Sequence, residues 1–269
     1  IVKDAARFFE DGEKMQLSYA VRNTHRTIGT RTSSLIVQKF GMRNNLQPDH
    51  LTIRLTGSAG QSLGAFAAPG LKIEVSGDAN DYVGKGLSGG TIVVRPPMAS
   101  PLVAADNTII GNTVLYGATN GHLFAAGRAG ERFAVRNSGA SVVIEGCGSN
   151  GCEYMTGGVA VILGRIGANF GAGMTGGMAY LYDPEGLARD YINPETLVMC
   201  AVTQDHWEDQ LKGLIERHLK ETGSRRADEI LSNWDREKGN FLQVCPKEML
   251  QHLSHPIEAV DQTRAVPAE

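Results

Sequence analysis

The chain has 269 residues, of which 42% are hydrophobic and 20% charged, a composition typical of a globular protein with a substantial core. Its 26 basic and 29 acidic residues leave a net charge of −3, which argues against binding to nucleic acid or to an anionic membrane surface through charge. No apolar run approaches the ~18 residues that span a bilayer, and residues 1–16 lack a signal-peptide pattern, so we expect a cytoplasmic protein.

Residues 1–50 are expected to lead into the fold and to cap it. An apolar residue occupies every second position of MQLSYAV (15–21), which predicts a strand. A short helix is expected over TRTSSLIVQKFG (30–41), with Thr30 as its N-cap and Gly41 at its end.

Glycine is concentrated in the middle of the chain, because 27 of the 33 glycines lie between Gly57 and Gly186 in a window with only 16 charged side chains. Apolar, largely β-branched strings separate the glycines, and each string predicts a strand: LTIRL, LKIEV, TIVV, TVLY, RFAV, SVVIE, VAVIL and MAYLY. Most strings begin at intervals of 18 to 22 residues. A step of 28 residues before Ser141 predicts a loop insertion or a partial extra turn around GHLFAAGRAG (121–130).

A period near 20 with short strands is typical of a solenoid in which successive strands stack at about 4.8 Å. We therefore predict a mainly β, single-stranded parallel β-helix (β-solenoid) over residues 51–186, with short flanking helices. Glycine suits the sharp corners of such a column, because it reaches positive φ without strain. The expected structural corner glycines are Gly84, Gly86, Gly89, Gly90, Gly157, Gly158, Gly171, Gly173, Gly176 and Gly177.

The G-x-G-x-x-G pattern beginning at Gly84 and again at Gly171 also fits dinucleotide binding. That function needs a helix directly after the glycines to receive the pyrophosphate. The strings that follow, TIVVRPP and MAYLYDP, are strand-like and end at proline. The pattern therefore favours corners over a nucleotide site.

Residues 187–269 form a helical, charged flank with 25 charged residues and three glycines. Apolar side chains recur at helical spacing over residues 207–219 and again over 227–234, which predicts two amphipathic helices. We expect these helices to cap or cover the column, because open strand edges recruit other chains.

The four cysteines do not indicate a metal site. Cys147 and Cys152 form a C-x4-C pair with no further cysteine or histidine pair nearby, and Cys200 and Cys245 are isolated, so reduced buried thiols are the favoured interpretation.

The carboxylate pairs Asp78 with Asp81 and Glu145 with Glu153 suit turns better than catalysis, since no acidic row recurs at the period of the strands. No catalytic residue is therefore assigned. One basic stretch, VRNTHRTIGTR, could hold an anion or pack on another domain, and the second interpretation is favoured. Its candidate interdomain contacts are Arg22, Asn23, His25, Arg26 and Arg31.

Several long motifs together resemble one family. LTIRLTGSAGQSLGAFAAPG (51–70), EVSGDANDYVGKGLSGGTIVVRPP (74–97) and VILGRIGANFGAGMTGGMAYLYD (161–183) are similar to the C-terminal GXGXG domain of the glutamate synthase large subunit, in its bacterial NADPH-dependent form. A subunit of formylmethanofuran dehydrogenase is a more distant resemblance. The start at Ile1 rather than Met predicts a fragment of a longer chain.

The resemblance implies a right-handed column and a noncatalytic scaffold domain. It implies that an amidotransferase domain and an FMN domain with an iron–sulfur cluster lie upstream on the same polypeptide, and that a small NADPH-oxidising subunit is a partner. The whole enzyme would make L-glutamate from L-glutamine and 2-oxoglutarate, with no cofactor on this segment. Two alternatives stay open: a carbohydrate-acting β-helix enzyme, and an interaction subunit of a formylmethanofuran dehydrogenase-like complex.

Overall fold

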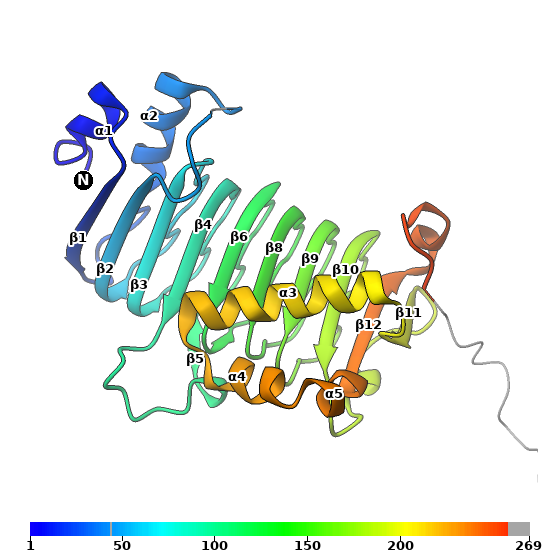
Figure 1. Cartoon of the computed structure of the whole chain (residues 1–269). Coiled ribbons are helices and arrows are strands. Elements are labelled where there is room, and N and C mark those ends of the chain that lie inside the picture. Colours follow the sequence, from blue (N-terminus) through cyan, green and yellow to red (C-terminus); the bar gives the residue numbers. More distant parts are fainter. Residues whose placement is uncertain (44, 258–269) are drawn as a thin grey trace, which may run out of the picture.

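A single sheet runs the length of the molecule, and helices lie at one end and across one face (Figure 1). This computed structural model describes residues 1–43 and 45–257. The α-helices are α1 (Ala6–Asp11), α2 (Thr30–Phe40), α3 (Asp205–Thr222), α4 (Arg225–Ser232) and α5 (Trp234–Glu237). The strands are β1 (Met15–Val21), β2 (Leu51–Ala59), β3 (Leu71–Ala79), β4 (Ser88–Arg95), β5 (Thr108–Ile110), β6 (Asn120–Ala125), β7 (Arg128–Ala129), β8 (Ser138–Ile144), β9 (Thr156–Ile162), β10 (Gly176–Tyr182), β11 (Leu197–Ala201) and β12 (Phe241–Pro246).

The sheet has the order β1-β2-β3-β4-β6-β8-β9-β10-β12-β11, with the short strands β5 and β7 paired beside it. All pairs are parallel except those of β12, which is antiparallel to both β10 and β11. Residues one repeat apart face each other, as Leu51 faces Leu71 and Ser141 faces Val159. The intervals near 20 residues therefore correspond to the register of neighbouring strands.

From β4 to β10 both faces of the sheet are buried, whereas in β2 side chains such as Arg54 and Thr56 are exposed on one face. One set of alternate side chains, such as Ile92 and Val142, packs into the interior between the strands and the returning chain. The other set, such as Phe124 and Val143, packs under α3 against Leu211. Helix α3 crosses the strands on this face (Figure 1), and burial on both faces explains why the strings are almost continuously apolar.

Opposite the strands, the chain passes through six turn segments, which we define as residues 62–66, 82–86, 113–117, 132–136, 150–154 and 169–173. In each of them the first, third and fifth residues have positive φ, between 52° and 71°. Their backbone N–H groups join neighbouring segments: Tyr82 N–H donates to the carbonyl of Asn112, and Leu115 N–H donates to that of Val83. The turn segments thus form a second hydrogen-bonded ladder alongside the sheet.

The predicted fold class is wrong. The described residues are 25% helix and 31% strand, with one twelve-stranded, mostly parallel sheet, so this is a mixed α/β fold rather than a mainly β right-handed parallel β-helix. The expectation treated the C-terminal helices as a flank and assumed that only inward-pointing side chains were buried. Helix α3 instead covers a sheet face, and the antiparallel β12 extends the sheet between β10 and β11.

Local predictions also need correction. TVLY (113–116) and RFAV (132–135) lie in turn segments instead of strands, because Thr113, Leu115 and other residues there have positive φ. GHLFA (121–125), assigned to an insertion, belongs to β6, and the extra length lies between β4 and β5. The helix at residues 30–40 is confirmed, although its N-cap is Gly29 and not Thr30. The helices expected over 207–219 and 227–234 are present as α3, α4 and the start of α5.

Candidate functional site

The ten predicted corner glycines divide into two groups. Gly84, Gly86, Gly171 and Gly173 occupy positive-φ positions in turn segments, while the other six lie in the first residues of β4, β9 and β10. In this second group a Cβ would meet the neighbouring chain, as on Gly176, where it would collide with the backbone carbonyl of Thr156. The six strand glycines are Gly89, Gly90, Gly157, Gly158, Gly176 and Gly177.

Neither G-x-G-x-x-G pattern is followed directly by the helix that dinucleotide binding needs. Strand β4 follows the first G-x-G-x-x-G pattern, and β10 follows the second. A phosphate at either pattern would therefore meet no helix N-terminus.

The basic stretch forms an exposed loop between β1 and α2. Arg22 N–H donates to His25 Nδ1 at 3.2 Å, and Asn80 Nδ2 donates to Asn23 Oδ1 at 2.8 Å, so the loop is fixed to the turn after β3. The side chains of Arg22, Arg26 and Arg31 are exposed, and none forms an ion pair with another residue that the structure describes. They leave this end of the molecule with unpaired positive charge.

The cysteines do not fit a metal or an iron–sulfur cluster. All four are buried, and burial raises the pKa of the Cys147 and Cys245 thiols to about 12 and that of Cys152 well above its usual range. Within residues 1–43 and 45–257, no group of three or more His, Cys, Asp or Glu side chains is placed to hold a metal ion.

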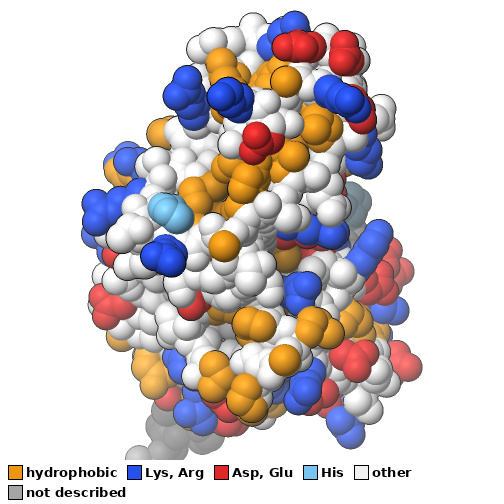
Figure 2. Space-filling model, turned by 90° about the vertical axis from the view of Figure 1, so that its left-hand side faces the viewer, with side chains coloured by type: hydrophobic (Ala, Val, Ile, Leu, Met, Phe, Trp, Pro, Cys, Tyr) orange, Lys and Arg blue, Asp and Glu red, His pale blue; other side chains and the backbone are white. Residues whose placement is uncertain are grey.

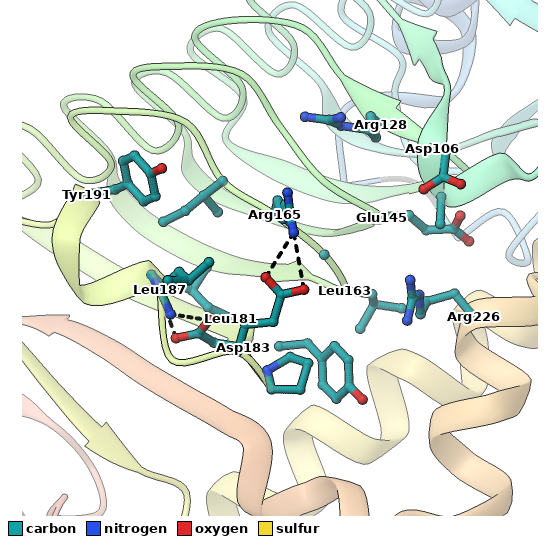
Figure 3. Close-up of a pocket in the computed structure, with 17 residues that line it drawn as sticks. Asp106, Arg128, Glu145, Leu163, Arg165, Leu181, Asp183, Leu187, Tyr191 and Arg226 are labelled. Carbon is teal, nitrogen blue, oxygen red and sulfur yellow. Dashed lines mark hydrogen bonds and ion pairs between the residues drawn. The ribbon is translucent and has the colours of Figure 1, made fainter.

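A cleft with a volume of about 590 Å³ lies beside the ends of β8, β9 and β10 (Figure 3). Arg165 forms a two-pronged ion pair with Glu185, with Nη2 to carboxylate distances of 2.9 and 3.2 Å, but both side chains are mostly exposed and contribute little stability. Asp183 accepts the backbone N–H groups of Leu187 and Ala188, at 2.9 and 3.0 Å. These contacts hold the loop after β10.

Glu145 lines the same cleft and is 2% exposed. It accepts a hydrogen bond from Ser224 Oγ, which itself caps α4 by accepting the Ala227 N–H at 3.0 Å. His218 Nε2 lies 3.5 Å from the same oxygen, Glu145 Oε1. Nucleophile activation needs a hydrogen bond between the hydroxyl and the imidazole, whereas neither ring nitrogen of His218 has a hydrogen-bond partner among the described residues. This cluster joins β8 to α3 and α4.

The carboxylates of the two pairs suggested by the sequence also have structural contacts. Glu153 pairs with Arg132 at 3.1 Å and does not meet Glu145. Asp78 accepts from Ser58 Oγ at 3.0 Å, and Asp81 accepts the Asn112 N–H at 2.8 Å. Sequence reasoning missed the cleft, since Arg128, Glu145 and Arg226 are far apart in sequence.

The end of the sheet formed by β1 carries a band of hydrophobic side chains between charged ones (Figure 2). The partly buried hydrophobic residues there include Ile1, Met15, Leu17 and Tyr19, which pack against the main core. None of the helices that the structure describes is both long and apolar enough to cross a membrane.

Residues 1–247 match the family model of the GXGXG motif. The chain belongs to this family. It is 65% identical over all 269 residues to the glutamate synthase [NADPH] large chain of Azospirillum brasilense, of which it spans 18%. It is 51% identical over 229 residues to ferredoxin-dependent glutamate synthase 2 of Synechocystis, and 44% identical over 246 residues to the glutamate synthase [NADPH] large chain of Bacillus subtilis.

Those last two matches cover 85% and 91% of this chain, and 15% and 16% of the two relatives. The chain therefore spans less than a fifth of the relatives' length. The expected resemblance to the GXGXG domain of the bacterial large subunit is confirmed. In this GXGXG chain, the pairs Gly84-x-Gly86 and Gly171-x-Gly173 fill the third and fifth positions of turn segments.

Proposed function

We propose that this chain is the GXGXG domain of a cytoplasmic glutamate synthase large chain and acts as its noncatalytic scaffold. The observation that carries the proposal is the 65% identity to such a large chain over the full length of this one. Neither the carbohydrate-acting enzyme nor the formylmethanofuran-type subunit gains support from the comparisons.

Rigidity supports the scaffold role. Each repeat is joined to the next by hydrogen bonds on two sides, through the sheet and through the turn segments. A body of this kind can hold an amidotransferase domain and an FMN domain at a fixed separation, which lowers the entropic cost of passing ammonia between them. FMN, the iron–sulfur cluster and contacts with a small NADPH-oxidising subunit would then belong to other parts of the enzyme.

The first test is spectroscopic. The purified 269-residue chain is expected to be colourless, to bind no FMN when dialysed against it, and to have neither glutaminase nor synthase activity. Stoichiometric flavin in a clean preparation would defeat the noncatalytic assignment.

The second test is coupling in the large chain. Deleting this segment should leave flavin bound while glutamine hydrolysis no longer yields an equivalent amount of glutamate. Full retention of glutamine-dependent synthesis by the deletion variant would contradict the scaffold role.

A further inference from the structure

The strand β1 is an end of the sheet order, with β2 as its neighbour on one side and no described strand on the other. Seven consecutive residues pair with β2 in unbroken register, from Met15 with Leu51 to Val21 with Gly57. The strand is therefore long and regularly paired with β2, and its other edge is open. An open edge of this kind can pair with a further strand.

The direction of the open backbone groups follows from one hydrogen bond. Met15 N–H donates to the carbonyl of His50 at 2.9 Å, so the odd-numbered residues of β1 direct their N–H and C=O groups toward β2. The even-numbered residues Gln16, Ser18 and Ala20 then direct theirs to the open side. Their side chains are exposed, so these groups form an accessible row with a repeat of about 6.6 Å.

This edge lacks the usual protection against pairing. Exposed edge strands are commonly guarded by inward charges, proline or a β-bulge. MQLSYAV contains no charged residue and no proline, and its pairing with β2 has no register shift. Beside it, Met15, Leu17 and Tyr19 are only partly buried against the core. Figure 2 shows hydrophobic side chains at the surface of this end of the molecule.

We infer that the β1 edge is a docking surface on which an extended segment of the rest of the large chain adds as a further strand. The inference rests on the proposed function, under which more than four-fifths of the polypeptide lies outside these residues, as it does in the Azospirillum relative. Tethering on one polypeptide favours such a segment over a free partner by raising its effective concentration.

The flanking charges define the chemistry of the occupant. Arg22 follows β1 directly and Arg26 lies in the same loop, and both are exposed without an ion pair to a described residue. The middle of the added strand faces the uncharged residues of β1 and a partly exposed apolar core end, with the carboxylate of Asp4 held beside it by the Tyr19 hydroxyl at 2.6 Å. The added strand is therefore uncharged in its middle, with alternating apolar side chains, and carries a carboxylate where it passes the two arginines.

The test is amide hydrogen exchange at single-residue resolution, in the 269-residue chain and in the large chain that contains it. In the isolated chain, Leu17 and Tyr19 should be protected by β2, while Gln16, Ser18 and Ala20 exchange freely. In the large chain the three even-numbered amides should slow by at least about 100-fold, with the odd-numbered amides as an internal control. Unchanged exchange at the even positions overturns the inference.

Substitutions in and directly after β1 test whether the protection of the even-numbered amides arises at this edge. Ser18→Pro removes one outward N–H on an edge strand, where proline is tolerated, and should return Gln16 and Ala20 in the large chain to free exchange. Ser18→Thr keeps the N–H and should retain protection. Arg22→Glu with Arg26→Glu should weaken protection without changing the melting temperature of the isolated chain; equal protection in this variant would contradict the assigned charge of the occupant.

Three further outcomes would identify a different occupant or separate a failure of this inference from a failure of the proposed function. Protection of the even amides in the isolated chain that rises with its concentration would identify a second copy as occupant and overturn the assignment to the large chain. If the deletion experiment shows normal coupling, the proposed function fails. If coupling is lost but the even amides still exchange freely in the intact large chain, only the inference about β1 fails.

Discussion

Each repeat of the glycine-rich window passes through a strand and then a turn segment, and the two hold their backbones in different ways. Strand residues have extended backbones, and alternate side chains are buried on opposite faces. Turn-segment residues alternate positive and negative φ over five positions, and more of the positive-φ positions carry a side chain than are glycine. The comparison shows that glycine is required mainly where the neighbouring chain leaves no room for a Cβ atom, and less because its backbone φ is positive.

The largest expected effect tests this point at a glycine whose φ is not positive. In Gly176→Val the new side chain would collide with the backbone carbonyl of Thr156, which belongs to the neighbouring strand and cannot move aside cheaply. We expect a loss of at least about 3 kcal/mol in the free energy of unfolding, or failure to fold. Urea denaturation followed by circular dichroism measures it.

Gly117→Ala is the matched control. Gly117 has a φ of +65°, but no atom lies within 4 Å of the position of its Cβ. The cost should be only the conformational one of about 1 to 2 kcal/mol. A loss for Gly117→Ala as large as that for Gly176→Val would show that φ, and not close approach, decides where glycine is required.

The next effect concerns the covered face of the strands. Leu211 of α3 is fully buried over the sheet, so Leu211→Ala should lower the free energy of unfolding by about 2 to 5 kcal/mol. Leu214 of the same helix is only partly buried, and Leu214→Ala should cost less than half as much. Equal effects in thermal melts would contradict the role of α3 as the cover of this face.

One type of substitution, to valine, separates the two backbones by the size of its effect. Arg136 is exposed at a positive φ of 53°, where a β-branched residue is strained, so Arg136→Val should cost about 1 to 2 kcal/mol. Thr56 is exposed in β2, where valine is favoured, so Thr56→Val should change stability by no more than about 0.5 kcal/mol. Similar denaturation midpoints for both variants would break the distinction between strand and turn segment.

The sequence predicts the strands better than the turn segments for a physical reason. Alternation and β-branching mark LTIRL and VAVIL correctly, and the intervals between strings anticipate the register of Leu51 with Leu71. TVLY and RFAV are also largely apolar but lie in turn segments. The hydrogen-bonded ladder between neighbouring turn segments imposes the positive φ at Thr113 and Ala134. Local propensity does not reveal such tertiary constraints.

The candidate sites follow the same rule. The exposed basic loop could be located from sequence, since Arg22, Arg26 and Arg31 lie close together along the chain. The cleft and its buried cluster could not, because Glu145 and Ser224 meet only after α3 has crossed the sheet. Helices that cap or cover the column were expected, but the crossing of β4, β6, β8 and β9 by α3 was not, and the predicted fold class was wrong.

The smallest effect concerns a charged contact between the covered face and its helix. Lys72 of β3 lies 2.7 Å from Glu221 of α3 and 2.9 Å from Glu74. Burial opposes ionisation of Glu74, but its hydrogen bond and ion pair with Lys72 prevail and hold its pKa below the usual value of 4.5. Since the folded-state pKa is the lower one, this stabilisation is complete above pH 4.5 and is lost as the pH falls through the lowered pKa.

Glu74→Gln should therefore flatten the acid side of the stability profile by about 1 kcal/mol or less, as measured by urea unfolding between pH 6 and pH 3. Glu185→Gln, which removes one partner of an exposed ion pair, is the control and should leave the profile close to that of the unchanged chain. A steeper acid loss in Glu74→Gln would mean that ionised Glu74 destabilises the fold, which would contradict the direction of its pKa shift.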